Sequence, residues 1–160
     1  AGLPSVRAAV KSATIKATYS DAHAMFKTAE HAEVAFYRAF ESADLDAMMA
    51  VWADSPDIVC IHPTGPILVG VDAIRESWRA IFAGGGGINL AVAVVQSQED
   101  DTMAVHLVEE HLTVTEDKTQ QAHVVATNMF RMEGGSWRLV LHHGSPAARP
   151  VAAGAAPTLH

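Results

Sequence analysis

Residues 58–65 read IVCIHPTG, and the rest of the chain is organised around this stretch. Its first four residues are apolar and rich in β-branched side chains, a pattern that predicts a buried strand. Pro63 cannot donate a hydrogen bond to a sheet ladder, and together with Gly65 it predicts a turn directly after the strand. His62 therefore ends a buried strand. There it is either a core histidine with satisfied hydrogen bonds or a reactive group at the floor of a cavity.

The composition indicates one globular domain. The chain has 160 residues, of which 49% are hydrophobic and 18% charged, enough for a core without disulfides. A net charge of −7 argues against nucleic acid or an anionic membrane as a partner. Cys60 is the single cysteine, and no apolar run approaches the roughly 18 residues that span a bilayer. We expect a soluble, cytoplasmic protein.

We divide the chain into an N-terminal extension over residues 1–24, a domain over residues 25–146 and a flexible tail over residues 147–160. The extension is basic, acid-poor and weakly amphipathic. It is either an organellar targeting segment or a helical or non-native addition ahead of a start at Met25.

Three helices are expected in the first half of the domain. The first covers residues 22–42, the second begins after Asp44 as N-cap, and the third begins near Asp72. Apolar residues recur at helical spacing in each. The stripes are Phe26, Ala29, Phe36 and Phe40 (broken by Glu33), then Leu45, Met48, Met49 and Trp52, then Ile74, Trp78, Ile81 and Phe82.

The second half changes from a helical period to a period of two. A short strand over residues 67–69 precedes four long ones, separated by polar turns. These cover residues 88–98, 102–115, 121–132 and 137–143. The plan is α+β: three N-terminal helices packed on a strongly curved, mostly antiparallel sheet, which leaves a conical pocket.

Alternation along the strands predicts which side chains enter that pocket. Asn128 is the single polar residue on the apolar face of its strand, and His143 shares a face with Leu139. The strand over residues 102–115 changes phase, and a bulge near residues 107–108 would turn Glu110 inward and His111 outward. With His62, these residues either converge on a ligand or satisfy one another in the core.

The sequence resembles the nuclear transport factor 2-like superfamily, and within it the SnoaL-like branch, over about residues 27–146. The resemblance implies a cystatin-like roll similar to that of ketosteroid isomerases. The motifs that carry it are DLD at 44–46, IHPTG at 61–65, GVDAIR at 70–75, SW at 77–78, IF at 81–82, ATN at 126–128, FR at 130–131, WRLV at 137–140 and HHGSP at 142–146.

Ketosteroid isomerases have an aspartate base before a proline, where this chain has His62. Their oxyanion hole uses a tyrosine, whose position falls on Phe36 with Tyr37 one residue away, and an aspartate, whose position falls on Asn128. The resemblance therefore implies His62 as general base and Asn128 as hydrogen-bond donor. The reaction would be of the isomerase, dehydratase or hydrolase type, by proton abstraction beside a carbonyl group or by activation of water. The substrate would be a small, mostly apolar molecule in a pocket lined by Phe36, Trp52, Trp78, Glu110 and His143.

Two other interpretations stay open. His62, His143 and Glu110 could form a metal site, but no short ligand spacing supports one, so we expect no metal and no cofactor. The chain could instead be a non-catalytic ligand-binding or association module. Relatives pair through the outer sheet face, which implies a homodimer through Val125, Thr127 and Met129. The resemblance extends to the ring-forming association domains of calmodulin-dependent kinases.

Overall fold

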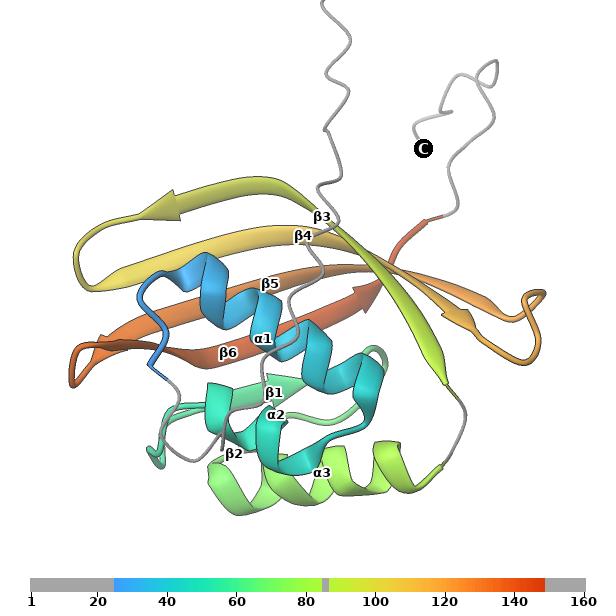
Figure 1. Cartoon of the computed structure of the whole chain (residues 1–160), viewed down its shortest axis with the longest axis horizontal. Helices are drawn as coiled ribbons and strands as arrows, with labels where there is room; N and C mark the ends of the chain where they lie inside the picture. The colour runs from blue at the N-terminus through green and yellow to red at the C-terminus, as the bar shows by residue number, and fades with distance from the viewer. Residues whose placement is uncertain (1–24, 85–86, 149–160) are drawn as a thin grey trace, which may run out of the picture.

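The computed structural model describes residues 25–84 and 87–148, which form three helices and six strands (Figure 1). The helices are α1 (Ala29–Ser42), α2 (Leu45–Val51) and α3 (Val71–Ala83). The strands are β1 (Val59–Ile61), β2 (Leu68–Val69), β3 (Ile88–Glu99), β4 (Met103–Val114), β5 (Gln121–Glu133) and β6 (Ser136–Pro146). The predicted extension, and residues 149–160 of the predicted tail, lie outside the described residues.

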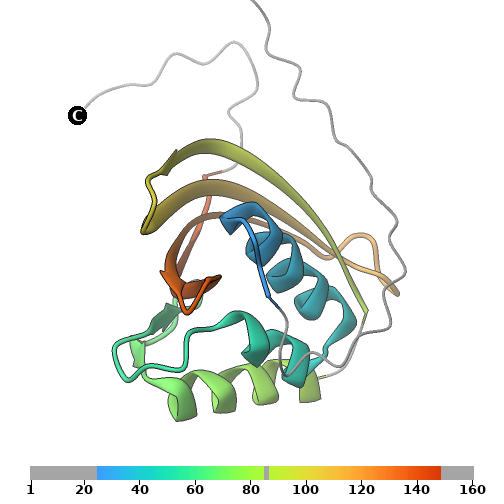
Figure 2. The same ribbon diagram turned by 60° about the vertical axis from the view of Figure 1, so that its left-hand side comes forward.

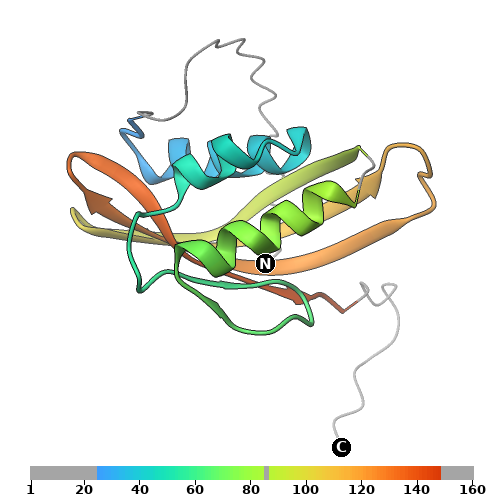
Figure 3. The same cartoon turned by 90° about the horizontal axis from the view of Figure 1, so that it is seen from below.

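The strands form one sheet in the order β2-β1-β6-β5-β4-β3, in which only the β1–β6 pair is parallel. The long strands β3 to β5 arch over α1, and α3 lies on the opposite side of α1 (Figure 2). Seen from below, α3 is nearest the viewer, beside α1 and in front of the sheet (Figure 3). The predicted α+β plan, with helices on the concave side of a curved sheet, is confirmed.

The helix starts follow from their caps. The Asp44 side chain accepts a hydrogen bond of 2.9 Å from the Ala47 N–H, as predicted for α2. Helix α1 begins later than predicted, after Thr28 as N-cap. The backbone of Phe26 is instead tied to the β5–β6 hairpin, because its N–H bonds Ser136 Oγ at 2.8 Å and its carbonyl accepts from Trp137. Among the described residues, no helix is long and apolar enough to cross a membrane.

The predicted bulge near residues 107–108 of β4 is wrong. Strand β4 alternates regularly, with Ala104, His106, Val108 and Glu110 all buried on its concave side. The register shift lies on β3, where Val94 pairs with Val108 and the next pairing is Gln96 with Leu107, so Val95 is the extra residue. Glu110 points inward as predicted, but without a phase change.

A second bulge, on β6, overturns the prediction that His143 faces inward. Met129 pairs with Leu141 while the next residue of β5, Phe130, pairs with Leu139, so Val140 is the extra residue. A single extra residue reverses the alternation of everything after it. His142 is therefore turned into the core with 4% of its surface exposed, and His143 is exposed.

The β6 bulge predicts unequal effects of two neighbouring substitutions. His142→Ala should lower the free energy of unfolding by about 2–4 kcal/mol, because it empties a buried site and removes a hydrogen-bond partner. His143→Ala should change it by less than about 0.5 kcal/mol. Chemical denaturation at neutral pH measures both; equal losses would contradict the register.

Candidate functional site

Six polar side chains are buried together on the concave face, and we call them the concave cluster. His106 of β4, Asn128 of β5 and His142 of β6 stand side by side in register across three strands. Glu110 follows four residues after His106 on the same face of β4. Helix α1 contributes the other two members, Glu33 and Tyr37, which lie one turn apart. The members are Glu33, Tyr37, His106, Glu110, Asn128 and His142, each no more than 7% exposed.

Hydrogen bonds join most of the cluster through Asn128, which is fully buried. Its Nδ2 donates to Tyr37 Oη at 2.9 Å and to Glu33 Oε2 at 3.1 Å. Its Oδ1 accepts from Nδ1 of His142 at 2.6 Å. Tyr37 Oη in turn donates to Glu110 Oε1 at 2.7 Å. The network thus links helix α1 to three neighbouring strands, and its buried groups satisfy one another.

One end of the cluster favours a charged histidine. Nδ1 of His106 lies 3.0 Å from Glu33 Oε2, close enough for an ion pair although not aligned as a hydrogen bond. The Glu33 carboxylate raises the pKa of His106, against the opposing effect of burial. Contact with Glu33 therefore favours the charged imidazolium.

The other end favours neutral groups. Burial raises the pKa of Glu110 to about 7, despite the hydrogen bond from Tyr37 that lowers it. Burial lowers the pKa of His142 to about 3, with the neighbouring His62 and His143 adding to the effect. Burial and the charge of Glu110 keep the pKa of Tyr37 above its ordinary value. Glu110 is therefore a carboxyl group of this cluster that exchanges a proton near neutral pH.

His62 lies outside the concave cluster. Its Nε2 is 3.1 Å from Ser77 Oγ on α3 and 3.7 Å from Cys60 Sγ, and its ring meets Trp78 edge-on. Partial burial lowers its pKa, which keeps the imidazole neutral. No described hydrogen bond joins His62 to Asn128, so the two predicted catalytic residues do not form one hydrogen-bonded unit.

The three aromatic residues predicted to line the pocket are packed in the core. Phe36, Trp52 and Trp78 are 1–3% exposed, and Phe36 contacts both tryptophans edge-on. Both indole Nε1 atoms are buried without a hydrogen-bond partner among the described residues.

Two hollows lie where β4 ends and β3 begins, beyond Glu110, a part of the concave face that we call its wide end. One, of about 440 Å³, is lined by residues that include Ile88, Leu112 and Ala122. The other, of about 290 Å³, lies between the ends of α1 and α3 and the start of β3, and Phe40, Phe82 and Ile88 line it. Ile88 is common to both. Neither is lined by His62, Asn128 or His143.

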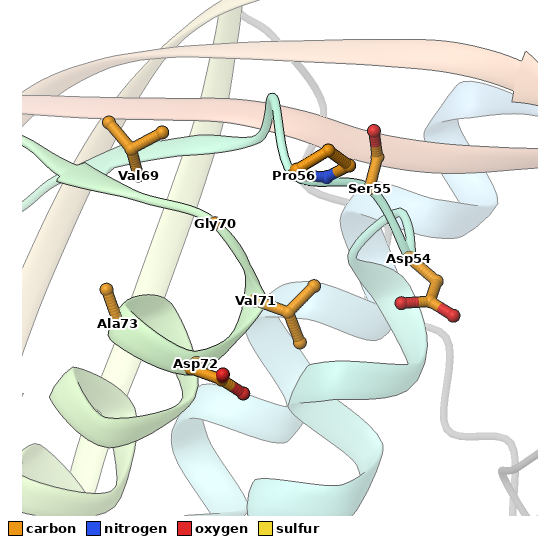
Figure 4. A pocket seen from close by; sticks show the side chains of 8 residues that line it. All are labelled: Asp54, Ser55, Pro56, Val69, Gly70, Val71, Asp72 and Ala73. Atoms are coloured by element: carbon orange, nitrogen blue, oxygen red, sulfur yellow. The ribbon is translucent and has the colours of Figure 1, made fainter.

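A third hollow, of about 430 Å³, lies at the start of α3 (Figure 4). Its lining includes Asp54, Val71 and Asp72 and no residue of the concave cluster.

Sequence reasoning found Asn128 and Glu110 but missed four members of the cluster. Tyr37 was placed one residue off the site, yet α1 is rotated so that both Phe36 and Tyr37 are buried. Glu33, read as a break in an apolar stripe, was the available signal that α1 faces polar groups. His106 was hidden by the phase change wrongly predicted on β4, and His142 by the β6 bulge, which the sequence pattern did not predict.

Comparison with known proteins identifies the family. Residues 29–149 match the SnoaL-like domain. The chain belongs to the SnoaL-like domain family. A solved structure from Thiobacillus denitrificans, named as a candidate calcium/calmodulin-dependent protein kinase type II association domain, is 40% identical with a TM-score of 0.74; the match covers 79% of this chain and 100% of that one.

Two further relatives are more distant. A candidate dehydratase of the NTF2-like family from Streptomyces avermitilis is 27% identical, over 74% of this SnoaL-like chain and 93% of that one, with a TM-score of 0.64. The F-box protein SKIP8 of Arabidopsis thaliana is 27% identical over 110 residues, which are 69% of this chain and 46% of that protein. The SnoaL-like chain thus spans about half the length of this relative.

The raised pKa of Glu110 predicts a pH-dependent stability difference. Between pH 4.5 and about 7 the folded state binds more protons at this site than the unfolded state, so the site's contribution to stability falls as the pH rises. The full loss is about 3 kcal/mol. Glu110→Gln should abolish this pH dependence of stability, because the amide does not titrate and can still accept a hydrogen bond from Tyr37.

Urea unfolding of both proteins at a series of pH values measures the effect. The difference in stability between the two proteins isolates the effect of Glu110 from that of His142. The lowered pKa of His142 makes stability change with pH in the opposite direction, because its contribution is lost as the pH falls from 6.5 towards 3. A difference that does not vary with pH would contradict the assignment.

Proposed function

We propose that this chain binds a small, mostly apolar molecule with one oxygen function at the wide end of the concave face, and transfers a proton through Glu110. The observation that carries the proposal is the 2.7 Å hydrogen bond from Tyr37 Oη to a buried Glu110 whose pKa is raised to about 7. Strongly shifted carboxyl groups with a specific partner cluster at functional sites.

The location follows from the two hollows at the wide end. Leu112, which lines one of them, is two residues beyond Glu110 on the same face of β4. Phe40, which lines the other, is three residues beyond Tyr37, one turn along α1. A ligand whose apolar part occupies these hollows would bring its polar end towards the Tyr37–Glu110 pair.

The chemistry that suits this pair is proton transfer beside a carbonyl group. Near neutral pH, Glu110 is present both as a base and as an acid, so it can take a proton from one carbon and return it to another. Both donors of the Asn128 amide are engaged by Tyr37 and Glu33, so the Tyr37 hydroxyl is the donor for the oxyanion formed between these two steps: once Glu110 has taken the proton, its carboxyl no longer needs the hydrogen bond from Tyr37. The Streptomyces relative, named as a candidate dehydratase, is consistent with acid–base chemistry on this fold.

His62 is the alternative base. It is neutral and only partly buried, and it approaches the concave cluster through Cys60, whose register partner is His142. An imidazole there could accept a proton from a ligand that enters from the α3 side. The two candidates predict different effects of substitution.

Exchange of the carbonyl-adjacent protons of 2-cyclohexenone with D₂O, followed by NMR, tests the proposal. We expect the protein to accelerate exchange and Glu110→Gln to reduce that acceleration by about 10²-fold or more, because the amide cannot take a proton. Tyr37→Phe should cause a smaller loss. Glu76→Gln, at an exposed carboxylate on α3, is the matched control and should have no effect.

His62→Gln in the same assay separates the two bases. Unchanged exchange supports Glu110, whereas loss of exchange in His62→Gln and not in Glu110→Gln would transfer the role to His62. If the wild-type protein neither accelerates exchange nor shifts its own resonances with the ketone, the proposal fails for this ligand class.

A second proposed function is self-association through the outer face of the sheet. Its support is the 40% identical Thiobacillus structure, which is covered over its full length and named as an association domain. The outer face of this chain carries half-buried apolar residues on three adjacent strands, which a second copy could cover. They are Val105, Leu107, Val125, Met129 and Leu141.

Light scattering coupled to size exclusion tests this second function. We expect the wild-type protein to elute as a dimer or larger assembly and Val125→Asp to elute as a monomer, because a buried unpaired charge disfavours the interface. Val34→Asp is the matched control, since Val34 is 43% exposed on α1, away from the sheet. A monomeric wild-type protein would contradict the assignment.

A further inference from the structure

Three potential metal ligands converge on the outer face of the sheet, opposite the concave cluster. Oε2 of Glu109 lies 3.8 Å from Nε2 of His111 and 3.8 Å from Nε2 of His123. The three atoms all lie within 4.8 Å of one another. The two imidazole rings are stacked, with centroids 4.1 Å apart and planes at 20°.

The strand pairing produces this convergence. His111 of β4 and His123 of β5 are direct cross-strand partners, and Glu109 is two residues before His111 on the same face. On β3, the other strand that pairs with β4, the register partners of Glu109 and His111 are Ala93 and Ala91, both exposed. These small side chains leave room beside the three ligands for an ion and its water.

We propose that Glu109, His111 and His123 bind a divalent transition-metal ion, with Zn²⁺ as the expected occupant. Two imidazoles and one carboxylate form a common three-ligand set for this ion, and they leave a fourth position to water. At metal–ligand distances of about 2.0–2.1 Å, neighbouring tetrahedral ligands are roughly 3.3 Å apart. The 3.8 Å separations are therefore near those around a bound ion, but one of the stacked rings must turn, because the lone pair of a ring nitrogen lies in the plane of its ring. The His111 side chain, which is 51% exposed, has the space to do so.

A separate observation points to an ion here. Nε2 of His123 is buried but has no hydrogen-bond partner among the described residues. At 3.8 Å, Glu109 is too far away to be a hydrogen-bond partner for either histidine. A buried ring nitrogen without a partner costs free energy, and a metal ion between it and the carboxylate would satisfy both. Without an ion, Nε2 of His123 would stay unpaired or would need a hydrogen bond to water.

The inference does not depend on the proposed proton transfer through Glu110. The three ligands lie on the outer face, whereas Glu110 and Tyr37 lie on the concave face. Glu109 and Glu110 are neighbours in sequence but point to opposite sides of β4. Loss of metal binding and loss of proton exchange can therefore be measured separately.

Titration of tag-free, chelator-treated full-length protein with Zn²⁺ by calorimetry tests the site. We expect one ion per chain, and each of Glu109→Gln, His111→Gln and His123→Gln should weaken binding by more than about tenfold. His31→Gln is the matched control, because His31 is an exposed imidazole on α1. The affinity of this variant for Zn²⁺ should equal that of the wild-type protein. Glu109 and His111 have side chains 43% and 51% exposed, so these two variants should fold even if His123→Gln does not.

Co²⁺ spectroscopy provides the second measurement. We expect visible absorption bands of a four-coordinate ion in the wild-type protein and their loss in His111→Gln. Binding should also weaken on acidification, because protons compete for the ligands. Binding that is not saturable, or that His31→Gln weakens as much as His111→Gln does, would overturn the proposal.

Discussion

The hydrogen bonds of the Asn128 side chain are the constraint on which the concave side depends. This amide is fully buried, and it joins the first helix to β5 and β6, two neighbouring strands that are far from that helix in sequence. A buried amide that loses its partners costs about 1–3 kcal/mol for each unsatisfied group. The rotation of α1, which brings Glu33 and Tyr37 onto the sheet, is therefore coupled to the direction in which His142 points.

A core of this size could be built from apolar residues alone. Replacing buried ionisable groups by well-packed apolar ones is often neutral or stabilising, so five such groups and an amide in one place are not explained by stability. Their environment also sorts them: contact with Glu33 favours the charged form of His106, whereas burial favours the neutral forms of Glu110 and His142. Titratable groups whose environments differ in this way can perform different chemical roles within one site.

Strand β4 separates two kinds of chemistry across the thickness of one sheet. Its concave side presents His106 and Glu110 to a dry interior, where burial controls protonation. Its outer side presents Glu109 and His111 near solvent, where an imidazole on β5 completes a set of metal-type ligands. Since alternate residues of a strand face opposite ways, a single residue of register decides which environment each group enters.

The sequence by itself determined the order of the elements, the antiparallel meander and the inward direction of Asn128. These features depend on local periodicity, caps and turns, which the chain carries in neighbouring residues. Only the tertiary structure decided which of His142 and His143 is buried and that Tyr37 reaches Glu110. The reason is physical: the extra residues Val95 and Val140 are ordinary valines, and a bulge arises from how a strand pairs with its neighbour. The rotation of α1 likewise depends on partners 73 to 95 residues away along the chain, which no local pattern contains.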